Sequence, residues 1–460
     1  MADPVGVSVA FDADPMAPDP AWTRIDTLSG CRVRGWTIDR GRPNEFEKTG
    51  TGTAVVRIVD LDGLFDPTNA SSPYHGKILP GKQAAVALQN PTGAHAWFTL
   101  FRGFVESWHY VLAPTRQWME LELQLVDGFA ILARAELRVG IDGALPLPAE
   151  IAKGNVAYGQ TLGTGADRVN AILGDVGWPV ELRDVFSLNV RLGPKAYGPG
   201  TSALDAIWDA LDGEFPGVAN GWMSKDGKFV VHGRQARFRP DVAEYGIQRR
   251  TVGDPSALTD AEVVPVSELE WSNGQDNLFN ACSATPQGIL LEDGTWRQLN
   301  PDPPDNDDVA GQYVKDDASI AAYGLRSITF DQLQTVEGLA TGNNSMVETK
   351  QFATYYVTNY KDPAPRISRM VFKARHPSAL NAGRLWDHMC RCEISDLLTL
   401  KTAHPGGGGF NEDFYVEGIH YTGDPGGPGA PQQPPIIHLE LDVSPRANYT
   451  TNPFDTDPDP

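Results

Sequence analysis

The sequence predicts a β-rich α+β protein of several domains, and three observations support this fold class. The chain has 460 residues, which is enough for roughly three or four domains of ~100 to 200 residues each. Hydrophobic residues make up 41% of it, which excludes a wholly disordered chain and supplies several cores. The 47 glycines and 36 prolines separate short segments, many of which alternate apolar and polar residues as strands do.

Residues 1–129 are predicted to form a β domain, either a barrel or a sandwich. Its clearest strand is Met119–Val126, in which apolar residues occupy one face and Glu or Gln the other, with the period of two that a half-buried strand shows. Another strand, residues 54–61, ends at Asp62-Gly63, a pair suited to a tight reversal. Three more strands are expected at Gln83–Gln89, at His95–Phe101 and from Arg102 onward, the first two separated by a turn at 91–93.

Residues 130–265 are predicted to form an α+β domain. Helical spacing of apolar residues appears in 129–139 and 166–173, and Thr164 with Asp167 forms a capping box before the second run. Ser202 and Asp205 repeat that pattern. A hairpin is expected about Asp226-Gly227. The helix after Ser202 should bury one stripe, which consists of Leu204, Ile207, Trp208 and Leu211.

The second half of the chain returns to β structure, with a second β domain predicted at 266–365 and a C-terminal β domain at 366–460. Its strands are expected after Glu268 and at 366–374, 396–400, 413–423 and 436–444. The Pro- and Asp-rich stretch 301–308 should be a loop. The Gly- and Pro-rich stretches 404–410 and 424–435 cannot maintain a strand ladder, and the acidic tail 452–460 is expected to be disordered.

The charge of the chain argues against nucleic-acid recognition. It carries 59 acidic and 38 basic residues, a net charge of -21, whereas each phosphate contact needs a Lys or Arg. The charge suits a surface past which DNA slides, although simple solubility explains it as well. No run of about 18 apolar residues and no signal peptide is visible, so we expect neither a membrane span nor secretion. Four scattered cysteines indicate a reducing compartment rather than a disulfide framework.

The residues give no catalytic or cofactor signature. The nine histidines, among them His75, His232 and His420, are dispersed, and none lies in a zinc-protease motif or beside a nucleophile elbow. Paired carboxylates are too frequent in so acidic a chain to select a glycosidase pair. The stretch Gly163–Val169 lacks the third glycine and the Lys-Ser/Thr ending of a phosphate-binding loop, so a helix start is the better interpretation.

Two segments were weighed as metal sites. His388, Cys390 and Cys392 alternate in the sequence and would share a face on a strand, but no second ligand pair accompanies them, so packed thiols are the better interpretation. Asp60–Asp66 places acidic residues at alternate positions, as a calcium loop does. Its glycine, Gly63, stands fourth instead of sixth, and Ser71 at the twelfth position cannot chelate, which favours a turn. We therefore predict no catalytic, cofactor or metal residue.

The stretch Gly35–Leu88 resembles the first domain of tail-hub proteins of siphophages that infect actinobacteria, which are related in fold to the baseplate hubs of contractile tails. Weaker similarity continues through 100–108, 127–137, 166–179, 201–211, 323–331, 362–372 and 414–421. The matching positions of the first stretch are Gly41, Arg42, Glu45, Gly52, Ala54, Asp62, Gly63, Phe65, Asp66, Pro67, Asn69, Ser72, Pro73, Tyr74, Gly76, Pro80 and Gly81.

The resemblance implies a non-enzymatic homotrimer in the virion, assembled in the host cytoplasm and placed at the tail tip. Each subunit would contain two related barrel-like domains, so that three subunits present six similar domains to a sixfold ring of tail protein. The trimer would close the tail tube and open for DNA ejection. Its implied partners are the distal tail ring, the C-terminus of the tape-measure protein, and tail fibre or spike proteins.

Two other functions stay open on the sequence alone: a tail-associated cell-wall hydrolase and a carbohydrate-binding tail-tip module. The 11 tryptophans suit the second through stacking on sugar rings, although aromatic residues also dominate cores and interfaces. The chain ends soon after its last predicted strand, so receptor binding or wall digestion is expected to lie in other chains.

Overall fold

A computed structural model describes most of the chain, and it is rich in β structure. Six α-helices and four sheets lie in the described part, the largest sheet having 14 strands. Within it, no helix is both long and apolar enough to cross a membrane. The described residues are 4–92, 94–113, 118–137, 156–158, 164–186, 188, 190, 192, 195–198, 200–254, 263–274, 277–290, 296–298, 312–338, 347–374, 382–404, 406–424 and 436–449.

The first third of the chain forms one half of the large sheet. Its strands are β1 (Val5–Val9), β2 (Thr23–Arg24), β3 (Cys31–Gly41), β4 (Thr53–Asp60), β5 (Gln83–Gln89), β6 (Trp97–Ala113) and β7 (Trp118–Val126). The order β3-β4-β7-β6-β5-β1-β2 is antiparallel throughout. The predicted alternation on β7 is confirmed, because Leu121, Leu123 and Leu125 are buried.

The prediction of two strands within 95–111 is wrong. Strand β6 runs unbroken for 17 residues and pairs with β5 along its first part and with β7 along its second. Gly103 lies inside this strand. A Cβ there would stand 2.2 Å from the carbonyl oxygen of Val126, so this glycine permits a close backbone approach.

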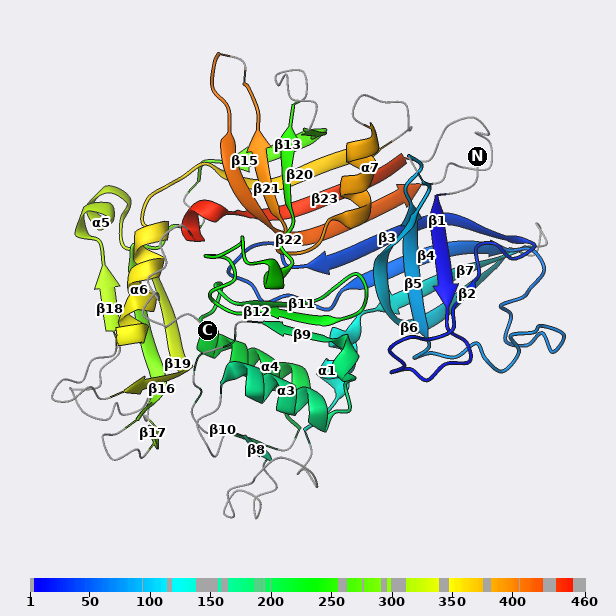
Figure 1. The fold of residues 1–460 in the computed structure, drawn as a ribbon, viewed down its shortest axis with the longest axis horizontal. Helices are drawn as coiled ribbons and strands as arrows, with labels where there is room; N and C mark the ends of the chain where they lie inside the picture. The colour runs from blue at the N-terminus through cyan, green and yellow to red at the C-terminus, as the bar shows by residue number, and fades with distance from the viewer. Residues whose placement is uncertain are drawn as a thin grey trace.

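The last third of the chain completes the same sheet (Figure 1). Strand β22 (Asn411–Asp424) pairs on one side with β21 (Leu397–Lys401) along its first residues and with β3 along its later ones, and on the other side with β23 (Ile436–Pro445). Beyond them lie β20 (Arg366–Ala374), β15 (Glu268–Ser272), β13 (Arg249–Gly253) and β14 (Val264–Pro265). The four strands predicted after residue 365 are thus confirmed, with boundaries shifted by a few residues.

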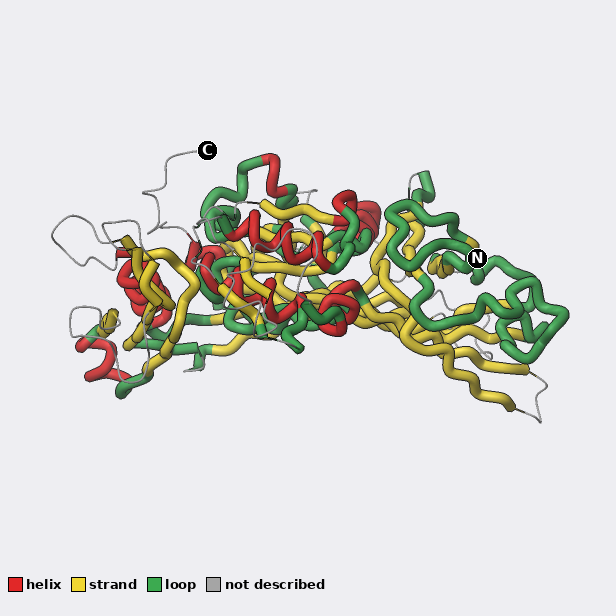
Figure 2. Tube along the Cα trace, turned by 90° about the horizontal axis from the view of Figure 1, so that it is seen from below, coloured by secondary structure: helices red, strands yellow, loops and turns green. Residues whose placement is uncertain are grey.

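One hydrophobic core runs through both halves of this sheet, and helix α7 (Ala382–Arg391) contributes to it. Across the described residues the strand path runs from β14 to β2 without closing on itself. The two barrel-like domains implied by the resemblance therefore stay predictions, as do the domain boundaries. Figure 2 shows an elongated molecule in which the N-terminal strands extend to one end.

The middle segment packs a second core between helices α1 (Gly128–Arg134), α3 (Gly165–Asp175) and α4 (Ala203–Leu211) and a sheet of β9 (Arg183–Phe186), β11 (Asn220–Met223) and β12 (Phe229–His232). The capping box of Thr164 and Asp167 is confirmed, and the Ser202 hydroxyl accepts the amide of Asp205. The hairpin is also confirmed, because β11 pairs antiparallel with β12 and Gly227 has φ +79°. Short elements here are β8 (Val156–Tyr158), β10 (Lys195–Tyr197), η1 (Val180–Leu182), η2 (Asp212–Glu214) and η3 (Ala243–Tyr245).

A third core lies between helix α6 (Val347–Tyr360) and a four-stranded sheet, at the end of the molecule drawn in yellow in Figure 1. That sheet contains β16 (Ala281–Leu290), β17 (Trp296–Gln298), β18 (Gln312–Lys315) and β19 (Ser327–Gly338), with α5 (Asp317–Tyr323) beside it. The predicted loop at 301–308 and the tail at 452–460 lie outside the described residues, as does the predicted loop 424–435 except Asp424, which ends β22. In the predicted loop 404–410, the described residues form no helix or strand.

Candidate functional site

A fully buried carboxylate, Glu417, lies where the two halves of the large sheet meet. The pairing of β22 with β23 shifts register between Val416 and Gly418, so Glu417 is the extra residue of a β-bulge. A bulge turns a side chain away from its regular direction. Here the side chain points into the protein, and Glu417 has no exposed surface.

Two buried arginines and a serine satisfy this carboxylate. Nε of Arg42 donates to Glu417 Oε2 at 2.8 Å, and Nη2 of Arg237 donates to the same oxygen at 2.9 Å. Oε1 accepts from Arg237 Nη1 and, at 2.6 Å, from the Ser444 hydroxyl. Burial alone would raise the pKa of Glu417, but the charges and hydrogen bonds of Arg237 and Arg42 lower it to about 2. The group is therefore ionised at any physiological pH.

These contacts connect segments that are far apart in the sequence. Arg42 follows β3, Arg237 follows β12, and Ser444 lies on β23. Tyr449, in η5 (Arg446–Tyr449), accepts a hydrogen bond from Arg237 Nη1 at 3.0 Å. The site thus ties the first third, the middle segment and the C-terminal strands to one point, which we call the ionic junction (Arg42, Arg237, Glu417, Ser444 and Tyr449).

A second buried carboxylate, Glu45, extends this connection to the third core. Its Oε1 lies 3.4 Å from the Tyr360 hydroxyl on α6 and 3.4 Å from Arg366 Nη1 on β20. Burial raises the pKa of Glu45. Asn448 in the C-terminal η5 donates to the same Tyr360 hydroxyl at 2.9 Å. Helix α6 is therefore hydrogen-bonded both to the segment after β3 and to the segment after β23.

His420 lies at the pairing of β22 with β3, the boundary between the two halves of the large sheet, which we call the seam. It stands on β22 opposite Asp39 of β3, with Nδ1 2.9 Å from Asp39 Oδ1 and Nε2 2.8 Å from Asp442 Oδ2. Hydrogen bonds to Asp39 and then Asp442 raise the pKa of His420 to about 10. Two carboxylate acceptors at both ring nitrogens favour the imidazolium, which donates from each.

The contacts of His420 with Asp39 and Asp442 make the free energy of unfolding depend on pH, and the sign follows from the raised pKa of His420. The folded state favours the charged imidazole, so the stabilisation is fully present below the ordinary pKa of 6.5 and is lost as the pH rises through about 10. We expect His420→Gln to destabilise the protein most at mildly acidic pH and least near pH 10. Urea titrations across this range test it. His75→Gln, at an exposed histidine, is the control, and a His420→Gln deficit that is constant with pH would contradict the assignment.

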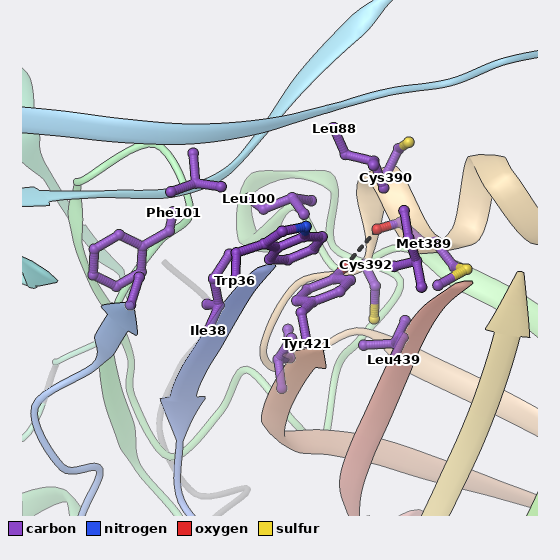
Figure 3. Packing of buried hydrophobic residues seen from close by; sticks show 14 of the residues in the cluster. Trp36, Ile38, Leu88, Leu100, Phe101, Met389, Cys390, Cys392, Tyr421 and Leu439 are labelled. Atoms are coloured by element: carbon purple, nitrogen blue, oxygen red, sulfur yellow. Dashed lines mark hydrogen bonds between the residues drawn. The ribbon is translucent and has the colours of Figure 1, made fainter. Parts of the chain in front are cut away.

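The segment weighed as a metal site is a helix, so its placement on a strand is wrong. His388 and Cys390 lie on α7, and Cys392 follows it. Figure 3 shows Cys390, Cys392 and Met389 among the packed side chains of Trp36, Leu88 and Tyr421. Burial raises the pKa of the Cys390 thiol to about 12 and that of the Cys392 thiol still further. Neutral, packed thiols are poor metal ligands, which favours the packing interpretation.

The other weighed motifs have structural places in the fold. Oδ2 of Asp60 accepts the Phe65 amide at 2.8 Å and Gly63 has φ +64°, which are features of a turn. The described part of Gly163–Val169 begins α3. His232 is buried beside Ser395, and burial lowers its pKa to about 3. Among the described residues, no three His, Cys, Asp or Glu side chains are grouped to hold a metal ion.

The sequence patterns do not predict the ionic junction, of which only Arg42 belongs to the resemblance; the neighbouring Glu45 belongs to the resemblance as well. One signal was present: Glu417 interrupts the otherwise apolar inward positions of its strand and is followed by Gly418, a combination typical of a bulge. Its partners Arg237 and Tyr449 lie 180 and 32 positions away along the chain. No local pattern connects them.

Comparison with solved structures shows the fold to be that of bacteriophage-type tail proteins. A tail protein from Neisseria meningitidis MC58 is 12% identical, with a TM-score of 0.53 over 97% of this chain and 98% of that one. The 43 kDa tail protein of prophage MuSo2 from Shewanella oneidensis is 10% identical, with a TM-score of 0.51 over 97% and 99%. No protein-family model and no curated protein sequence matches this chain.

Proposed function

We propose that this chain is a structural component of a phage tail, the trimeric hub that closes the tail tube at its tip. The observation that carries the proposal is the shared fold, which extends over nearly the whole length of two tail proteins. The sequence pattern of Gly35–Leu88 supports the same class. The similarity to these two proteins, at 12% and 10% identity, is one of fold, and the hub position is our inference.

The ionic junction suits a structural subunit. Its charged groups form ion pairs with one another inside the protein. They therefore hold segments together and are inaccessible to a substrate. A single core extends across both halves of the large sheet, which joins the first and last thirds of the chain into one unit.

In this role three copies form a closed ring, because one interface repeated about an axis leaves no unpaired patch. The ring accepts the sixfold distal tail ring on one side and fibre or spike proteins on the other, and it holds the C-terminus of the tape-measure protein. A change in subunit packing at infection opens the passage for DNA. The net charge of -21 disfavours adhesion of that DNA to the wall.

The oligomeric mass tests the proposal. We expect the purified full chain to have three times the monomer mass by light scattering, with the monomer mass recovered in denaturant as the control. A hexamer, or a monomer that persists at high protein concentration, would contradict the hub assignment. A zymogram on host cell wall is expected to show no clearing, since we propose no catalytic activity.

A further inference from the structure

Two partly exposed tryptophans lie on one outer face of the N-terminal end of the large sheet. Trp97 begins β6 and is 38% exposed, and Trp22, just before β2, is 37% exposed. Most large apolar side chains of this region are in the core instead. Two exposed tryptophans on the same end of one sheet suggest a binding role.

The surface between them is made of small side chains. Register places Arg24, Ser8, Ala85 and Arg102 in one row across four strands. The adjacent row contains Gly6, Ala87 and Thr99. On β5 the alternate positions 84, 86 and 88 are buried, so these rows face outward. We call this surface the tryptophan face (Trp22, Trp97, Arg24, Arg102 and the small residues Gly6, Ser8, Ala85, Ala87 and Thr99).

Each tryptophan is held by an arginine. The Arg24 guanidinium lies 4.0 Å from the centroid of the Trp97 ring, and that of Arg102 lies 5.5 Å from Trp22. Gly6 is needed beneath them, because a Cβ there would stand 2.8 Å from Trp97 and 3.0 Å from Arg24. The rings are therefore fixed before any ligand arrives, which lowers the entropy cost of binding.

The arginine charges are engaged within the protein. Arg24 forms an ion pair with Asp26. Arg102 donates to Gln83 Oε1 and to the carbonyl oxygens of Ala17, Pro18 and Asp226. A phosphate or sulfate ligand would have to displace these contacts on a chain of net charge -21. The face therefore matches an uncharged ligand that presents flat apolar patches and hydroxyls.

We infer that the tryptophan face binds a neutral oligosaccharide, with pyranose rings stacked on Trp22 and Trp97. The apolar face of a sugar ring packs on an indole as other flat apolar groups do, while Ser8 and Thr99 offer hydroxyls to the sugar edges. The small side chains of Ala85 and Ala87 add no bulk beside the indoles. This inference does not rest on the tail role.

Calorimetric titration of the full chain with chitohexaose and with maltohexaose tests it, with an oligogalacturonate as the anionic comparison. We expect at least one neutral hexamer to bind, and Trp22→Ala and Trp97→Ala each to weaken that binding about tenfold or more. The matched control is Trp271→Ala, which removes a tryptophan that is 51% exposed on β15. It should leave the affinity unchanged.

Three outcomes would overturn the inference. These are no binding of either neutral hexamer, binding that is indifferent to both substitutions, and a preference for the anionic oligomer. A changed oligomeric mass of the two variants would identify the face as a subunit contact instead. Trp22→Phe keeps a flat ring and is expected to retain most of the binding, which separates stacking from a folding defect. Light scattering tests the trimer and calorimetry tests sugar binding, so either proposal can fail without the other.

Discussion

Glu417→Gln is expected to lower the free energy of unfolding by about 3 to 5 kcal/mol, because it removes the negative charge from a buried cluster and leaves Arg42 and Arg237 uncompensated. Both arginine side chains are at most 3% exposed and the Glu417 side chain is wholly buried. Water cannot replace the lost partner. The shape of the side chain is kept, so the loss reports charge and not a cavity.

Urea denaturation, monitored by tryptophan fluorescence, measures this effect. Two further variants serve as comparisons. Glu122→Gln breaks an exposed pair with Arg57, which is 58% exposed, and should cost at most about 1 kcal/mol. Ser444→Ala removes one hydrogen bond to Glu417 and should cost about 1 kcal/mol. Equal losses for Glu417→Gln and Glu122→Gln would show that the ionic junction does not hold the sheet together.

Gly41→Ala is expected to cost at least about 2 kcal/mol, and it tests the seam from the backbone side. Gly41 has φ +97°, a conformation that costs an L residue roughly 1 to 2 kcal/mol. A Cβ would also stand 2.2 Å from the carbonyl oxygen of Glu417. Since that carbonyl accepts the amide of Arg42 at 3.0 Å, relief of the clash must move the β-bulge and its carboxylate.

Gly50→Ala is the matched control for this substitution. Gly50 is exposed, has no atom within 4 Å of an added Cβ and does not have a positive φ. Its replacement should be neutral, or stabilising by up to about 1 kcal/mol through the unfolded state. The comparison uses the midpoint of urea denaturation for both variants. A Gly41→Ala protein as stable as Gly50→Ala would mean that the seam adapts freely.

Local signals in the sequence were sufficient wherever the deciding interactions are local. The alternation on β7, the capping box at Thr164 and the turn at Gly227 each depend on residues within a few positions of one another. Helix α7 had such a signal too. Leu385 with Met389 and Trp386 with Cys390 are spaced four apart and buried, but the alternate cysteines drew attention to a strand.

The sequence by itself determined the β-rich class, clearly alternating strands such as β4, β5 and β7, the starts of α3 and α4, and the resemblance to tail hubs. Only the tertiary structure decided that β6 is continuous, that β3 pairs with β22 and that Glu417 is buried between Arg42 and Arg237. Residues 42 and 417 meet because two sheet halves share one core, and that pairing is stabilised by packing and desolvation summed over many strands. No short window of sequence contains those terms, so the ionic junction exists only once the chain has folded.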